Sequence, residues 1–263
     1  MPLSKTQKNI IKNSVEKLLN LEIRVQEKSK DISRGDTSPF LISLLGTRNT
    51  LLVKVGQSIQ TTMGMSFYEQ TCKLIGENVG FTVELQKKCL GFLSEEVIQY
   101  LRKLDKMDYV PNRMQELEDI RNISKNIKKS KKIEYPDSTV DVYITTKDKR
   151  EILIDITTVK PNKKEFRIMK QKTLRWAAYR MSQDPEVKIE PYFAIPYNPE
   201  GSSIDSVVYT RFKNYYDRKD ILVGDELWKK ISNNTCSIND VVGIFNELGD
   251  EMGKSINKTL RNI

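Results

Sequence analysis

The stretch TVDVYITTKDKREILIDITT, residues 139–158, has the pattern of two β-strands joined by a short polar turn. Residues 139–145 alternate, with β-branched side chains throughout, which is typical of a strand that buries one face. Residues 151–159 form a second, more apolar run, and the charged residues 147–150 separate the two. The pattern predicts a β-hairpin at the centre of the fold. One acid, Asp155, stands in the middle of the apolar run, and its charge needs an explanation.

The length of the turn decides where a second acid, Asp141, lies relative to Asp155. Side chains on a strand alternate between the two faces of a sheet. A three-residue turn pairs Thr146 with Arg150 and puts Asp141 directly opposite Asp155. A five-residue turn leaves the two acids diagonal on the same face, whereas a four-residue turn sends them to opposite faces.

Two aspartates that face each other on paired strands are unfavourable by themselves, because like charges across a pair repel. A cation should offset that cost. The chain has no histidine, so a divalent metal held by oxygen, such as Mg²⁺, is the candidate cofactor. The alternative without a metal is that Asp141 is exposed and Asp155 pairs with a lysine or arginine.

The composition favours a protein that acts on a polyanion. The 263 residues are 38% hydrophobic and 30% charged, with a net charge of +9, and a basic chain of this kind suits nucleic acid. No apolar run reaches the roughly 18 residues of a membrane span, and the N-terminus lacks the apolar core of a signal peptide. Three widely spaced cysteines show no metal pattern, so we expect a reduced, cytoplasmic compartment. These cysteines are Cys72, Cys89 and Cys236.

The remainder of the chain is mostly helical by pattern. Apolar residues at helical spacing predict helices over residues 4–30, 113–132, 165–181, 206–215, 225–231 and 238–248. Residues 50–104 are predicted to be a helical region with interruptions, two of which are marked by Gly64 and by residues 77–80. A third strand is expected at residues 188–195. A strand-containing centre between helical flanks predicts an α/β fold.

The acids of the hairpin resemble the core of the PD-(D/E)-x-K nuclease superfamily. That core has one acid on the first strand and an acid-x-lysine on the second, as Asp141 and Asp155-Ile156-Thr157 do in part. Asp137 in Pro136-Asp137 is an alternative first acid, but it precedes the strand. On this resemblance Asp141 and Asp155 hold the metal.

A wider match resembles the TdeIII family of type II restriction endonucleases. DITTVKPN, which begins at Asp155, is similar to the EIKTxKPN stretch of that family. The segments SIQTTMGMSFYEQ, FRIMKQKTLRWAAYRM, IPYNPEG and LVGDELW also resemble the family, in that order, between Ser58 and Trp228. The resemblance implies a restriction-endonuclease fold, with a central mixed sheet flanked by helices, and Mg²⁺-dependent double-strand cleavage of a short palindromic DNA site. It also implies a homodimer and a cognate DNA methyltransferase in the same system.

Within that resemblance we expect a helical N-terminal region, residues 1–132, for dimerisation and DNA contacts. Residues 133–263 would then be the nuclease core with C-terminal helices, in one compact unit with the first region. The rival functions are a non-specific or repair nuclease of the same fold and a catalytically silent DNA-binding protein.

Thr157 departs from the family, which has lysine there. A hydroxyl can hold a water but carries no positive charge. Lys160 is the nearest replacement, because Pro161 should end the strand and free the Lys160 side chain. Lys170 or Lys172 on the following helix is a second source, and a site that works without lysine, or has lost cleavage, is a third possibility.

Basic residues crowd the helix that follows the motif. Lys163, Lys164, Arg167 and Lys170 are candidate DNA contacts, with a solvated helix face as the alternative. Asn198, in a Tyr-Asn-Pro turn, is a candidate for reading a base edge, with a purely structural turn as the alternative.

Overall fold

The computed structural model describes residues 3–35, 37–105, 110–125, 138–157, 161–201 and 216–261. The chain divides into two compact units. The first runs from Cys72 to Asn239 and contains the sheet, and the second combines Pro2–Thr71 with Asp240–Ile263. The predicted boundary between residues 132 and 133 lies outside the described residues and stays a prediction.

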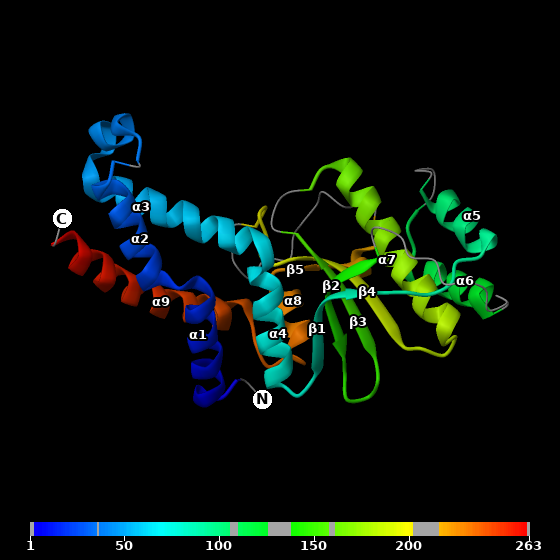
Figure 1. Ribbon diagram of the computed structural model, residues 1–263. Coiled ribbons are helices and arrows are strands. Elements are labelled where there is room, and N and C mark those ends of the chain that lie inside the picture. Colours follow the sequence, from blue (N-terminus) through cyan, green and yellow to red (C-terminus); the bar gives the residue numbers. More distant parts are fainter. Residues whose placement is uncertain are drawn as a thin grey trace. The chain divides into compact units, whose positions relative to one another are not determined.

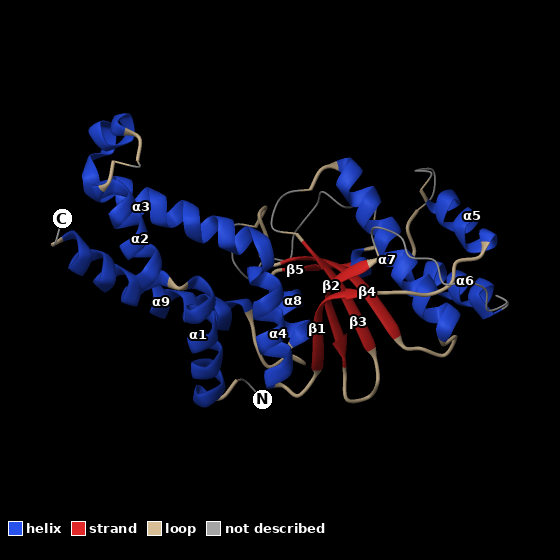
Figure 2. Ribbon diagram, in the orientation of Figure 1, coloured by secondary structure: helices blue, strands red, loops and turns tan. Residues whose placement is uncertain are grey.

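The first unit is built on a mixed five-stranded sheet in the order β1-β2-β3-β4-β5 (Figure 2). The strands are β1 (Thr82–Lys88), β2 (Thr139–Thr145), β3 (Glu151–Ile156), β4 (Ile189–Ile195) and β5 (Ile221–Val223). β1, β2 and β3 are antiparallel neighbours, whereas β3, β4 and β5 run parallel. The predicted α/β class with a central mixed sheet is confirmed.

The turn between β2 and β3 has the three-residue form. The Thr146 amide donates to the Arg150 carbonyl at 2.9 Å, and the register continues through Val142 opposite Ile154. Lys149 closes the turn with a left-handed φ of 62°, as the last residue of such three-residue loops commonly does. One further step in this register brings Asp141 to the level of Asp155.

Helix α7 (Lys163–Gln183) covers the sheet face that carries Asp155. Its buried residues Trp176, Ala177 and Tyr179 belong to the same core cluster as Leu153 of β3 and Tyr143 of β2. Helices α5 (Glu95–Leu104) and α6 (Arg113–Lys125) pack against α7. Figure 1 shows this helical layer on one side of the sheet and α4 (Tyr68–Asn78) and α8 (Asp225–Ile231) on the other.

The second unit is helical. It contains α1 (Lys5–Leu19), α2 (Leu21–Ser33), α3 (Pro39–Thr62), the π-helical turn η1 (Met63–Phe67), the start of α4 (Tyr68–Asn78) and most of α9 (Ile238–Leu260). Val25, Leu51 and Ile256 form part of its core, and Lys12 pairs with Glu247 and Glu251. None of the helices in the described part of the chain combines the length and apolar character needed to cross a bilayer.

Several boundaries differ from the sequence analysis. Residues 50–104 were predicted to be helical, which is wrong for β1, and β5 was not predicted at all. Asn20, with a left-handed φ of 48°, divides the first predicted helix into α1 and α2. The predicted helix at 206–215 and the predicted end of the second strand at 158–159 lie outside the described residues.

The contact between Gly91 and α7 offers a test of the packing. A Cβ atom at Gly91 would lie 2.3 Å from the Tyr179 carbonyl oxygen and 2.5 Å from its Cα atom, so the backbone would have to move. We expect Gly91→Ala to lower the free energy of unfolding by about 1–3 kcal/mol or more in urea titrations. Gly249→Ala, which meets no atom within 4 Å, should instead add up to about 1 kcal/mol in helix α9. Equal stability of Gly91→Ala and the unmodified chain would contradict the close approach.

Candidate active site

Asp155 is a buried acid on the α7 side of the sheet. Its residue is 6% exposed, and it stands opposite Phe193 of β4 in the parallel register. Leu153, two residues earlier on the same face, belongs to one apolar cluster and Phe193 to another. The carboxylate is therefore held between two apolar clusters, where an uncompensated charge is costly.

Asp141 lies beside Asp155 and is fixed by the backbone of β3. The Ile156 amide donates to Asp141 Oδ2 at 2.8 Å, and Gln86 Nε2 lies 3.4 Å from Asp141 Oδ1. Gln86 occupies the β1 position opposite Asp141 and has a positive φ of 50°. The two aspartates therefore share one face, as the three-residue turn predicted.

A lysine from α7 reaches the pair. Lys172 Nζ lies 2.5 Å from Asp155 Oδ1 and 5.2 Å from the centroid of the Trp176 ring. The Lys172 side chain is 18% exposed, so the ion pair is largely removed from water. Of the sources considered for the missing lysine, the described part of the chain brings Lys172 to the acids.

One lysine does not fully compensate this site. The pKa of Asp155 is raised to about 6, because burial penalises the charged carboxylate more than the Lys172 charge favours it, and the neighbouring Asp141 charge raises the pKa further. A pairing of Asp155 with lysine was expected in the absence of a metal. The structure contains this pairing, with Lys172, and burial still raises the pKa of Asp155 above its ordinary value.

The described residues contain no cluster of three or more acid, cysteine or histidine side chains that could hold a metal ion. Two carboxylates are present, and Mg²⁺ is usually bound through one or two carboxylates together with water and substrate phosphates. The donor set therefore suits Mg²⁺ in the presence of DNA rather than a metal enclosed by protein alone. Thr157 extends the β3–β4 ladder by one hydrogen bond, from its amide to the Ala194 carbonyl at 3.0 Å, and alternation puts it on the Asp155 face.

The candidate DNA contacts do not all lie on the surface. Lys170 is 6% exposed and its ammonium pairs with buried Glu116 at 2.8 Å, so the interior position does not support it as a phosphate contact. Arg167 and Lys164 are exposed, whereas Asn198 is buried and its Oδ1 accepts from the Glu200 amide, as in a structural turn.

Three other predicted positions fall outside what the structure describes. Lys160 and Asp137 lie outside the described residues, as does the side chain of Lys163. Their predicted roles therefore stay predictions. Gln86 was missed because its segment was taken to be helical, although Thr82–Lys88 carries the alternating pattern of an exposed strand.

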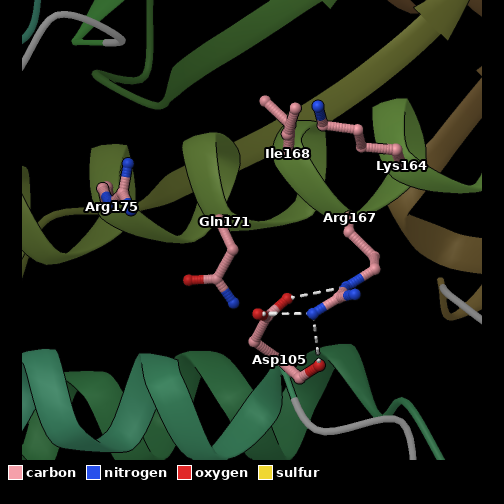
Figure 3. A pocket seen from close by; sticks show the side chains of 6 residues that line it. All are labelled: Asp105, Lys164, Arg167, Ile168, Gln171 and Arg175. Carbon is pink, nitrogen blue, oxygen red and sulfur yellow. Dashed lines mark hydrogen bonds and ion pairs between the residues drawn. The ribbon is translucent and has the colours of Figure 1, made fainter.

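A basic cleft of about 380 Å³ lies between the end of α5 and the outer face of α7. Figure 3 shows Arg167 and Gln171 pointing toward Asp105, with Lys164, Ile168 and Arg175 along the same helix. The Arg167 guanidinium contacts both carboxylate oxygens of Asp105, at 3.1 and 2.7 Å.

Comparison with known proteins gives this arrangement a context. Residues 3–249 match the family described as "Type II restriction endonuclease, HinfI". The chain belongs to the HinfI family of type II restriction endonucleases. It is 27% identical over 274 residues to the type II restriction enzyme MjaII of Methanocaldococcus jannaschii, a match that covers 94% of this chain and 72% of that enzyme.

Two further relatives come from Herpetosiphon aurantiacus. The chain is 22% identical over 232 residues to the type II restriction enzyme HgiCII, with 87% of this chain and 83% of that enzyme covered. It is 26% identical over 227 residues to HgiEI, with coverages of 84% and 79%. No solved structure matches the chain.

Membership in the HinfI family makes the protein a site-specific deoxyribonuclease. The predicted type II restriction endonuclease is confirmed, and so is the corresponding α/β fold with its mixed sheet and helical N-terminal region. The match is to HinfI and does not confirm the narrower TdeIII assignment.

The raised pKa of Asp155 predicts how stability depends on pH without a metal. A carboxyl whose pKa is higher in the folded chain binds its proton more tightly there. Its contribution to the free energy of unfolding is therefore fully present below about pH 4 and is lost as the pH rises through about 6. A shift from 3.8 to about 6 corresponds to a loss on the order of 3 kcal/mol. We expect urea titrations in EDTA from pH 4 to 8 to show that the free energy of unfolding falls less for Asp155→Asn than for the unmodified chain. Parallel pH profiles would contradict a buried, under-compensated acid.

Proposed function

We propose that this HinfI-family enzyme makes Mg²⁺-dependent double-strand cuts at a short palindromic DNA site with a core of the PD-(D/E)-x-K type. The observation that carries the proposal is the meeting of Asp141, Asp155 and Lys172 on one face of the sheet. Two acids and a lysine are the side chains that this nuclease core requires. Here the lysine would come from α7, whereas the position two residues after the second acid is Thr157.

Asp141 and Asp155 would hold the metal. Bound Mg²⁺ would polarise the scissile phosphate and favour the attack of water at neutral pH. The Ile156 amide fixes the orientation of Asp141 through its 2.8 Å hydrogen bond, so the two carboxylates are presented together before any ligand arrives. Such preorganised groups cost no rearrangement during the reaction.

Lys172 would supply the positive charge of the missing strand lysine. Its ammonium is held beside Asp155 and above the Trp176 ring, so it would lie close to a phosphate bound at the two acids. The Thr157 hydroxyl, on the same face, would orient a water molecule. Lys160 is retained as the alternative donor of positive charge.

The assembly and the partners belong to the same proposal. A palindromic site is cut on both strands by two copies of one active site related by a twofold axis, which favours a homodimer. Residues 1–132 would contribute to dimerisation and DNA contacts, and residues 133–263 would form the nuclease core. A cognate DNA methyltransferase would protect the host sequence without contacting this chain.

Incubation of phage DNA with the purified chain tests the proposed reaction, with Mg²⁺ in one arm and EDTA in the other. Discrete fragments that appear only with Mg²⁺ would support site-specific cleavage. A smear would indicate a non-specific nuclease, and intact DNA in both arms would indicate a DNA-binding protein that does not cut.

The two acids should be required for cleavage and not for binding. We expect Asp141→Asn and Asp155→Asn each to lower the single-turnover rate by at least about 10³-fold, because each loses a metal ligand. Duplex binding in EDTA should stay within a few-fold, because most affinity comes from phosphate contacts elsewhere. Glu118→Gln, which changes an exposed acid of α6 by the same charge, is the control. Near-normal cleavage by either aspartate variant would rule out its assigned role.

Moving the lysine provides a sharper test of Lys172. We expect Lys172→Met to lower the single-turnover rate by about 10²- to 10³-fold. Adding Thr157→Lys to that variant should raise its rate again by about tenfold or more, because the positive charge returns to the strand. Lys103→Met, at an exposed position of α5, should cut normally.

A second measurement on the same variants does not depend on cleavage. Lys172→Met removes the positive charge that repels Mg²⁺ at the two acids. Mg²⁺ binding in the absence of DNA, measured by calorimetry, should therefore tighten roughly several-fold. Normal cleavage by Lys172→Met together with impaired cleavage by Lys160→Ala would transfer the role to Lys160.

A further inference from the structure

The cleft between α5 and α7 is lined by three cations and one acid. Lys164, Arg167 and Arg175 come from α7, and Asp105 follows the last residue of α5. Gln171 donates its side-chain amide to the Leu101 carbonyl at 3.0 Å and so ties the two helices together beneath the cleft. The lining is basic and open to solvent.

The cations follow one face of α7. Lys164, Ile168, Gln171 and Arg175 recur at intervals of four, three and four residues, which puts them on a single stripe. At 1.5 Å per residue the stripe is about 16 Å long. Because double-stranded DNA carries one charge per strand every 3.4 Å or so along its axis, several phosphates can lie along such a stripe.

Asp105 holds Arg167 in the geometry of a phosphate contact. The Asp105 carboxylate accepts from Nε and Nη2 of Arg167 at 3.1 and 2.7 Å. Arginine binds a phosphate through the same two-pronged arrangement. Both side chains are more than a third exposed, and exposed ion pairs contribute little net stability, so a stronger anionic ligand can displace Asp105.

We propose that this cleft binds the phosphate backbone of the substrate DNA and that Asp105 occupies the place of one phosphate on Arg167 until DNA displaces it. The proposal rests on the nuclease function proposed above, since it takes double-stranded DNA as the ligand. It assigns Arg167 and Lys164 to sequence-independent affinity, with Asp105 as an internal competitor that weakens binding to DNA in general. Arg175 lies at the far end of the same stripe and extends the contact.

The test measures binding of a fluorescein-labelled DNA duplex by anisotropy in EDTA, over a series of salt concentrations. We expect Arg167→Ala and Lys164→Ala each to weaken binding about five- to tenfold at low salt and to reduce the slope of log affinity against log salt by about 1. Asp105→Asn should strengthen binding several-fold, roughly, by releasing Arg167. Glu118→Gln makes the same charge change on an exposed helix of the same unit and should have a smaller effect.

A double variant isolates the competition. When Arg167 is already alanine, Asp105→Asn should change DNA affinity no more than Glu118→Gln does, because Asp105 then has no arginine to withhold from the DNA. An equal gain in both backgrounds would overturn the role of Asp105. Unchanged affinity and salt slope in Arg167→Ala and Lys164→Ala would overturn the DNA assignment of the cleft.

These outcomes are separate from those of the proposed reaction. Binding is measured without divalent metal, so it does not require cleavage. If the unmodified chain cuts phage DNA while the cleft variants bind normally, the cleft assignment fails and the nuclease stands. If the cleft variants lose binding but the unmodified chain never cuts, the cleft assignment stands and the proposed nuclease reaction fails.

Discussion

Two ion pairs between β3 and α7 determine the rest of the site. Glu151 and Asp155 are four residues apart on one strand and therefore share a face, and each is met by a cation of α7. Arg180 contacts both oxygens of Glu151 at 2.7 Å, while Lys172 contacts Asp155 at 2.5 Å. Removing one partner of a buried pair leaves the other charge uncompensated, so the two pairs hold α7 to β3 at the middle and near the C-terminal end of the helix.

The two acids of this strand have opposite electrostatic states. Burial acts against the charged form of Glu151, but hydrogen bonds from Arg180 and the Tyr143 hydroxyl more than offset it and lower the Glu151 pKa. At Asp155 the balance is reversed: burial and the neighbouring Asp141 outweigh Lys172, and the pKa rises to about 6. At one end of the strand Arg180 and Tyr143 thus fully compensate the Glu151 carboxylate, whereas at the other end Lys172 only partly compensates Asp155. The neighbouring Asp141, rather than the raised pKa itself, separates Asp155 from Asp220, whose pKa burial also raises to about 6 although Arg113 pairs with it.

The sequence was sufficient to predict the hairpin and its acids, since β-branched alternation and a charged turn are local features. It could not choose between Lys170 and Lys172, because two residues on a helix differ by about 200° of rotation and the sheet selects which one faces it. In the structure Lys170 pairs with Glu116 and Lys172 pairs with Asp155. β1 was missed because its outer face is polar and charged, which weakens the strand pattern, and Gln86 was missed with it. The three residues of β5 are too few for any periodicity to show.

The position of Lys172 above an indole gives the molecule an optical property. The chain has two tryptophans, and the Trp228 Nε1 donates to the Pro196 carbonyl at 2.9 Å. Trp176 is buried, its Nε1 has no hydrogen-bond partner among the described residues, and a full positive charge lies 5.2 Å from its ring centroid. The excited state of indole is sensitive to a nearby charge, so any event that displaces the ammonium changes the emission of this one residue. Trp176 is in this sense an intrinsic fluorescent probe of the charge beside Asp155.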